Sequence, residues 1–260
     1  MKIIDIHTHV YPSAIAGKAA QNVRNYYHIG RQMDGTPEML LQKGSEAGIS
    51  QYVILPVAIR PENVASINHF VLEQVREHPC FIGFGTLHAD MEHIGDAAQE
   101  VADLGLKGIK LHPDCQKFDI DDPRLFPAYE AIQGRLPVFL HMGDERYNYS
   151  HPARLRKVLS LFPRLDALAA HFGGYSMYET ARQELKDTHC IMDISSSLMF
   201  MAPGEAERYI NLYGAERMAF GTDYPVWDPA EEVKRFLRLK LTAAQQEQIA
   251  WRTAYRFLGL

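Results

Sequence analysis

Two histidines near the amino terminus, His7 and His9, are spaced for metal binding. They stand two positions apart in the segment Asp5-Ile-His-Thr-His9, which follows an apolar start and predicts a β-strand. Side chains alternate between the two faces of a strand, so both imidazoles share one face with Asp5 and can converge on one ion. Asp5 lies deeper in the strand, where we expect it to support the barrel floor or a ligand rather than bind metal. A His-x-His pair also occurs by chance, so further residues must decide.

Further histidines and a late aspartate follow other apolar runs. The chain has 12 histidines; His112, His141 and His171 end such runs, and His88 follows another. Asp223 ends the last run, in the segment 220–225. Burying titratable side chains is costly unless a metal or a hydrogen-bond partner satisfies them. In a closed barrel the last strand neighbours the first, so Asp223 can meet His7 and His9. The alternative is an aspartate that caps a helix or a turn.

The elements that position these residues are eight short apolar runs, rich in Val, Ile, Leu and Phe. The runs span residues 2–6, 52–57, 81–87, 108–112, 137–141, 167–171, 190–194 and 218–222. Their lack of strict polar alternation is typical of parallel strands covered on both faces. Stretches with helical spacing lie at residues 37–47, 62–78, 94–104, 124–133, 152–161 and 205–212. This order predicts an α/β chain folded as a (β/α)8 TIM barrel, with one domain over residues 1–260.

Such a barrel gathers the carboxyl ends of its strands at one mouth, where active sites are built. Residues 11–35 form a long first connection, which we expect to cover the mouth with Tyr26, Tyr27 and Met33. Residues 242–258 predict a final amphipathic helix that packs against the barrel.

Five of the eight predicted strands carry a family resemblance, in the family's order. The segments are Asp5-Ile-His-Thr-His9, Gly108-Ile-Lys-Leu-His-Pro113, Pro137-Val-Phe-Leu-His141, Ala170-His-Phe-Gly-Gly174 and Gly221-Thr-Asp-Tyr-Pro225. Together they resemble the amidohydrolase superfamily, in particular the amidohydrolase-related group that includes aminocarboxymuconate semialdehyde decarboxylase. Each segment alone is a weak signal, whereas the set is specific.

This resemblance implies one divalent metal ion, usually zinc, bound by His7, His9, His141 and Asp223. It also implies a water on the metal, with His171 beside that water. Zinc lowers the pKa of a bound water toward roughly 7, which supplies hydroxide at neutral pH. Asp223 can accept the proton of that water and return it to a leaving group. His171 can orient the water or stabilise an oxyanion, so both are candidate catalytic residues.

Four further residues are candidates for substrate binding. Lys110 and His112 point the same way on the fourth strand, and Arg60 and Arg146 follow the second and fifth. The cations among them would suit a carboxylate-bearing small molecule. In two-metal relatives a carboxylated lysine bridges the ions, and Lys110 could instead have this role. His112 could instead be a polar residue of the rim, and the two arginines could be solvated surface residues.

Three functions remain open from the sequence. The first is metal-dependent hydrolysis of a small amide, ester or lactone by a metal-activated water. The second is decarboxylation, without oxidation, of an aromatic or unsaturated carboxylic acid at the same metal site. The third is a catalytically inactive barrel that serves as a binding protein, which the intact set of metal-binding residue types disfavours.

Composition excludes several partners. The net charge is -5 and no run is rich in Lys and Arg, which disfavours nucleic-acid binding. The amino terminus lacks the long apolar stretch of a signal peptide or a membrane span, so we expect a cytoplasmic chain without membrane contact. Three separated cysteines argue against a disulfide framework. Pairing into a homo-oligomer is left open.

Overall fold

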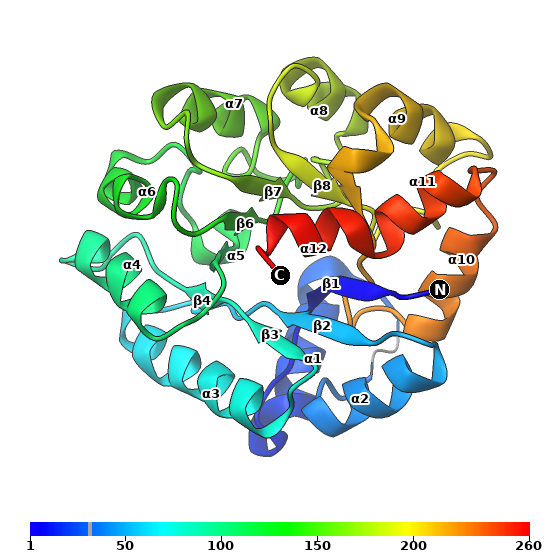
Figure 1. Cartoon of the computed structure of the whole chain (residues 1–260). Helices are drawn as coiled ribbons and strands as arrows, with labels where there is room; N and C mark the ends of the chain where they lie inside the picture. The colour runs from blue at the N-terminus through cyan, green and yellow to red at the C-terminus, as the bar shows by residue number, and fades with distance from the viewer. Residues whose placement is uncertain (31–32) are drawn as a thin grey trace.

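The computed structural model describes residues 1–30 and 33–260, and within them the strands form a closed parallel barrel (Figure 1). The strands are β1 (Ile4–Thr8), β2 (Gln51–Ile54), β3 (Phe81–Gly83), β4 (Gly85–Thr86), β5 (Ile109–Leu111), β6 (Val138–Leu140), β7 (Ala167–Ala169), β8 (Ile191–Asp193) and β9 (Met218–Ala219). They pair in parallel in the orders β1-β2-β3 and β4 to β9. The predicted (β/α)8 barrel is confirmed.

The nine strand segments of the described residues correspond to the eight predicted strands, because two of them are parts of one run. The run 81–87 is divided at Phe84, but the backbone N–H of Phe84 donates to Ile54 O at 3.0 Å. β3 and β4 therefore form one continuous strand of the barrel. The barrel closes where Ile6 N donates to Phe220 O at 2.9 Å and His9 N donates to Tyr224 O at 2.7 Å. The last strand therefore lies beside the first, as the sequence predicts.

Helices surround the strands in Figure 1. They are α1 (Ser13–Tyr27), α2 (Pro37–Glu46), α3 (Val64–Glu77), α4 (Ile94–Asp103), α5 (Pro113–Gln116), α6 (Phe126–Ile132), α7 (Pro152–Leu161), α8 (Tyr178–Leu185), α9 (Glu205–Tyr213), α10 (Pro229–Leu237), α11 (Ala243–Glu247) and α12 (Thr253–Phe257). Local caps fix several starts; for example, the Thr36 hydroxyl accepts from Met39 N and Pro37 begins α2. In the two described ranges, no helix combines the length and apolar character needed to cross a membrane.

The six predicted helices are all present, with shifts at their ends. The segment 242–258 departs from one continuous helix, because a π-helical turn over residues 248–252 separates α11 from α12. Thr242 begins it with a capping box to Gln245. In Figure 1, α12 crosses the end of the barrel that faces the viewer, whereas α1 lies behind β1 and β2.

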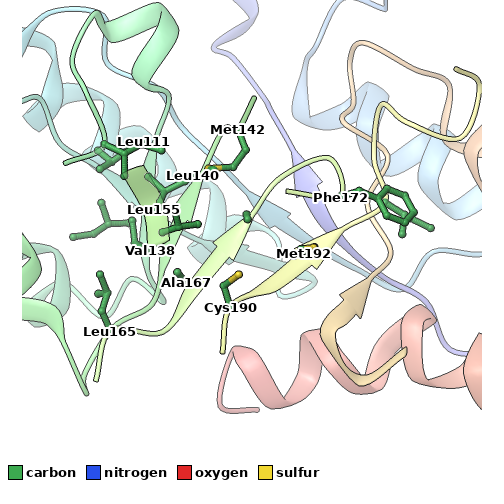
Figure 2. Close-up of a cluster of buried hydrophobic side chains, with 14 of the residues drawn as sticks. Leu111, Val138, Leu140, Met142, Leu155, Leu165, Ala167, Phe172, Cys190 and Met192 are labelled. Carbon is green, nitrogen blue, oxygen red and sulfur yellow. The ribbon is translucent and has the colours of Figure 1, made fainter. Parts of the chain in front are cut away.

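Two apolar clusters hold the barrel together. The inner cluster fills the barrel and includes Ile4, Ile6, Phe84, Phe139 and Leu168. Ala254 of α12 and Leu258, the residue after that helix, also belong to it. The outer cluster lies between strands and helices; Figure 2 shows its part around β6, β7 and β8, with Val138, Leu155, Cys190 and Met192. The alternation of apolar side chains between these clusters explains why the strands read as continuous apolar runs.

Candidate metal centre

Asp223 meets both histidines of the first strand. The Nε2 atoms of His7 and His9 each lie 3.4 Å from Asp223 Oδ1. The backbone sets this arrangement, because Asp223 N donates to His7 O at 2.8 Å. Gly221 permits the close approach, since a Cβ at that position would lie only 2.9 Å from the Cβ of His7. The convergence expected from the strand ends is therefore present.

The other ring nitrogen of each histidine has its own partner. His7 Nδ1 lies 2.9 Å from Asp193 Oδ2, and His9 Nδ1 lies 2.6 Å from the carbonyl oxygen of Leu55. Both partners accept hydrogen bonds, so each ring carries a proton on Nδ1, and the other nitrogen, Nε2, is the one that faces Asp223. Carboxylates and backbone carbonyls orient metal-binding histidines in this way.

The Nε2 atoms of two imidazoles thus converge on one carboxylate oxygen. This donor set of two nitrogens and one oxygen suits a divalent ion. Burial lowers the pKa of His7 to about 4, helped by the positive charge of Lys110, so this imidazole is neutral at pH 7. Burial alone would raise the pKa of Asp223, but His7 and His9 hold it well below the ordinary value. The residues fit a metal ion.

His171 and His141 lie next to this centre in different ways. His171 forms one potential metal-binding group with His7 and Asp223, in which the ligand atoms lie within 4.8 Å of one another. His171 Nε2 lies 3.1 Å from His141 Nδ1. His141 Nε2 instead faces Tyr27 Oη at 3.4 Å. His171 is therefore grouped with His7 and Asp223, and the role of His141 as a ligand stays a prediction.

Backbone strain is concentrated at this centre. His171, Phe172, Ser196 and Asp223 have φ angles of 59°, 54°, 49° and 61°. The left-handed region costs a residue with a side chain about 1 kcal/mol. These four residues keep the left-handed conformation because the strand ends and their hydrogen bonds fix the backbone, as at many functional sites.

Lys110 is fully buried on β5. Its Nζ lies 4.2 Å from the centre of the Phe139 ring and has no hydrogen-bond partner in the part of the chain that the structure describes. Burial lowers its pKa from 10.5 to about 8, although Asp193 and Asp223 oppose the shift. An ammonium without hydrogen bonds is costly inside a fold, which favours a functional reason for its presence.

Replacing Lys110 with methionine should therefore stabilise the metal-free protein, by about 2 kcal/mol at pH 7. The folded protein binds fewer protons than the unfolded chain between pH 8 and 10.5. The stability gained by Lys110→Met should therefore be full below pH 8. It should disappear as the pH rises to 10.5, because the parent then holds a neutral Lys110 and becomes more stable. Urea unfolding at pH 7 and pH 10 measures this, with exposed Lys107→Met as the control. A Lys110→Met variant less stable than the parent at pH 7 would contradict the cost of the buried charge.

The remaining substrate-binding predictions lie in three environments. His112 is buried and its Nε2 contacts Tyr27 Oη at 2.8 Å. Arg60 is 74% exposed and faces Glu62 at 3.9 Å, away from any described contact with the centre. Arg146 binds Asp144 through two nitrogens and stacks on Tyr26. Substrate contacts for all of them, Lys110 included, stay predictions.

Several residues of the site were missed from the sequence. Asp193 is fully buried at the end of β8 and accepts hydrogen bonds from His7 and from the backbone of Ser195. An acidic residue that ends an apolar run was the available signal. Asp114 was missed as well and carried no comparable signal. Two other residues had been expected. Asp5, expected as a support, accepts from Thr222 N at 2.9 Å and from His7 N at 3.1 Å at the seam of the barrel, and Tyr27, expected at the mouth, contacts His112.

Comparison with known proteins assigns this geometry to a family. The model of the family described as Amidohydrolase matches residues 4–260. A curated relative from Dictyostelium discoideum, named 2-amino-3-carboxymuconate-6-semialdehyde decarboxylase, is 23% identical; the match covers 99% of this chain and 91% of the relative.

Solved structures share the fold over the whole chain. One is 5-carboxyvanillate decarboxylase from Sphingomonas paucimobilis, with a TM-score of 0.77, 15% identity and coverage of 100% of this chain and 99% of the other. Another is a dihydroxybenzoic acid decarboxylase from a Polaromonas species, with bound manganese and the inhibitor 2-nitroresorcinol. Its TM-score is 0.78 at 17% identity, and 100% of this chain and 97% of the other are covered.

Proposed function

The chain belongs to the amidohydrolase family, and from this premise we propose that it is a metal-dependent decarboxylase of a small aromatic or unsaturated carboxylic acid. The hydrolase that the sequence placed first is the less supported candidate, because the curated relative and several structural neighbours are named decarboxylases. The observation that carries a metal-dependent reaction is the convergence of His7 Nε2 and His9 Nε2 on Asp223 Oδ1.

We propose that His7, His9 and Asp223 hold one divalent ion, with His141 or His171 as a further ligand. Bound there, the ion would polarise substrate oxygens and stabilise developing negative charge. The sequence favours zinc, whereas manganese is present in one related structure, so the proposal is limited to a divalent ion.

The surrounding residues supply charge and a proton. The buried ammonium of Lys110 favours an anionic substrate at the mouth, since it has no counter-ion in direct contact among the described residues. His171 Nδ1 lies 3.1 Å from the carbonyl oxygen of Ser195, which places its proton there and leaves the lone pair on Nε2, now 3.1 Å from His141 Nδ1, as the atom that would take up and return a proton. Decarboxylation replaces a carboxylate on carbon by a hydrogen, and His171 Nε2 and Asp223 are our candidates to move that proton.

The products of the reaction test this proposal. The purified protein is stripped with a chelator, reloaded with zinc or manganese, and incubated with 2,6-dihydroxybenzoate, 5-carboxyvanillate and a set of lactones and amides in ¹⁸O-labelled water. We expect carbon dioxide release from an acid, no ¹⁸O in the organic product, and at least about 100-fold loss after chelation. An ¹⁸O-labelled product without carbon dioxide would restore the hydrolase. A protein that takes up no metal on reloading and turns over none of these compounds would favour the inactive binding barrel.

A further inference from the structure

A second buried polar group lies beside the candidate metal centre. It consists of His112, Asp114 and His141, whose nitrogen and oxygen atoms lie within 4.8 Å of one another. The rings of His112 and His141 are stacked with their centres 4.0 Å apart. Asp114 is only 3% exposed, and neither of its carboxylate oxygens has a partner of good hydrogen-bond geometry among residues 1–30 and 33–260. The Ser150 hydroxyl interacts with it more weakly and opposes the rise in its pKa that burial causes. An acceptor left bare in this way indicates that a donor is still to be bound.

His112 is a hydrogen-bond donor within this group. Its Nδ1 accepts from the backbone N–H of Cys115 at 3.3 Å, which caps α5. The proton of the neutral ring is therefore on Nε2. A metal ligand would need a lone pair on Nε2 and a donor at Nδ1, which is the opposite arrangement. The cluster therefore does not fit a second metal ion, despite its two histidines and one carboxylate.

The other two members are acceptors. Because His171 Nδ1 donates to Ser195 O, His171 Nε2 carries a lone pair and accepts from His141 Nδ1 at 3.1 Å. His141 Nε2 is left with a lone pair, 4.0 Å from Asp114 Oδ2. The group thus offers one donor and two acceptors around one point.

Tyr27, the last residue of α1, already places a hydroxyl group there. Its Oη accepts from His112 Nε2 at 2.8 Å and can donate to His141 Nε2 at 3.4 Å. This hydroxyl does not reach Asp114, whose oxygens remain unpaired in the described part of the chain. One ligand atom from each of the three residues lies within 4.8 Å of the other two, so a point at most about 2.8 Å from each lies between them, which is hydrogen-bond distance. A hydroxyl oxygen at that point would satisfy the group better than Tyr27 does.

We propose that His112 and Asp114 form a subsite for a hydroxyl group of the substrate, and that Tyr27 fills this subsite until the substrate displaces it. The statement that the ligand is a substrate rests on the decarboxylase proposed above. A hydroxyl accepts from His112 and donates to Asp114, whereas a carboxylate meets two acceptors and an ammonium meets a donor. If His141 turns Nε2 toward the metal ion, His112 and Asp114 still supply one donor and one acceptor.

Binding of small probes to a Tyr27→Ala variant tests the subsite without turnover. Calorimetry compares phenol with fluorobenzene, benzoate and benzylammonium, which fill similar space with different polar groups. We expect phenol to bind about 10-fold more tightly than fluorobenzene, and benzoate to bind no more tightly than fluorobenzene. Benzylammonium can gain from the Asp114 carboxylate but should bind less tightly than phenol, because the His112 Nε2 donor faces it. Adding His112→Phe should remove the preference for phenol. Tyr26→Ala is the matched control, because the Tyr26 hydroxyl has no described partner, and it should create no such preference.

The outcomes separate this subsite from the proposed reaction. If Tyr27→Ala unfolds, Tyr27→Leu keeps a helix-forming residue at the end of α1 and vacates the same hydroxyl position. Equal binding of phenol and fluorobenzene, or tighter binding of benzoate, would overturn the subsite. Since no probe is turned over, a failure of the decarboxylase assay leaves the phenol result standing, and the reverse also holds.

Discussion

An Asp223→Asn variant is expected to bind its metal ion at least about 100-fold more weakly and to lose about 1000-fold in kcat/KM for carbon dioxide release. Asp223 Oδ1 lies 3.4 Å from the Nε2 atoms of both His7 and His9 and carries the negative charge of this group. Asparagine keeps the shape of the side chain but removes that charge. Elemental analysis and metal titration by calorimetry measure the first effect, and the assay of carbon dioxide release from a carboxylic acid measures the second.

The matched control for this change is Asp166→Asn, an exposed aspartate just before β7 at the other end of the barrel. Its metal content and kcat/KM should equal those of the parent. An Asp223→Asn protein that retains one ion with unchanged affinity would remove Asp223 from the metal centre and leave His171 and His141 as the ligands to test.

The barrel could be predicted because burial on both faces shapes the sequence of every strand. Runs such as Pro137–His141 contain few polar residues until the strand ends, so a change to histidine marks the mouth. Helix ends were visible where a cap and a proline coincide, as at Thr36 and Pro37. The helix α1 was hidden in a connection of mixed composition, since Ala16 and Ala20 are its buried residues and such small side chains mark no regular apolar face.

The metal-binding side of the site could also be predicted, from strand ends that must share a rim. Closure of the barrel brings Asp223 to His7 and His9 whatever the loops do. The direction of the His141 ring could not be predicted, because it depends on hydrogen bonds with His171 and with Tyr27 of α1, which are distant in sequence. The pairing of Arg146 with Asp144, two residues away, likewise depends on a local turn that spacing does not reveal.

Asp193 shows how a residue outside the predicted site can control it. Its carboxylate accepts from His7 Nδ1 at 2.9 Å, from Ser195 N at 2.9 Å and from His171 N at 3.2 Å. Burial alone would raise the pKa of Asp193, but the neighbouring imidazole of His7 holds it well below its ordinary value. A fixed charge at this position therefore keeps the His7 proton on Nδ1 and the lone pair on Nε2.

An Asp193→Asn variant should invert this arrangement while the fold is kept. The amide oxygen can still accept from the backbone, but the amide nitrogen would then face His7 Nδ1 as a donor and move the His7 proton to Nε2. We expect about 100-fold weaker metal binding and a comparable or larger loss of kcat/KM. Nitrogen NMR of the imidazoles reports the tautomer, and calorimetry reports the metal affinity.

A Ser195→Ala variant separates tautomer control from simple loss of a contact. The Ser195 hydroxyl also lies 3.0 Å from His7 Nδ1, but its removal leaves the Asp193 carboxylate in place, so the tautomer should persist and metal affinity should fall less than about 10-fold. If Asp193→Asn inverts the His7 tautomer and the ion still binds with parental affinity, His7 Nε2 is not a ligand. If the tautomer persists in Asp193→Asn, the carboxylate is not what orients the ring, and the metal affinity should then stay at the parental value.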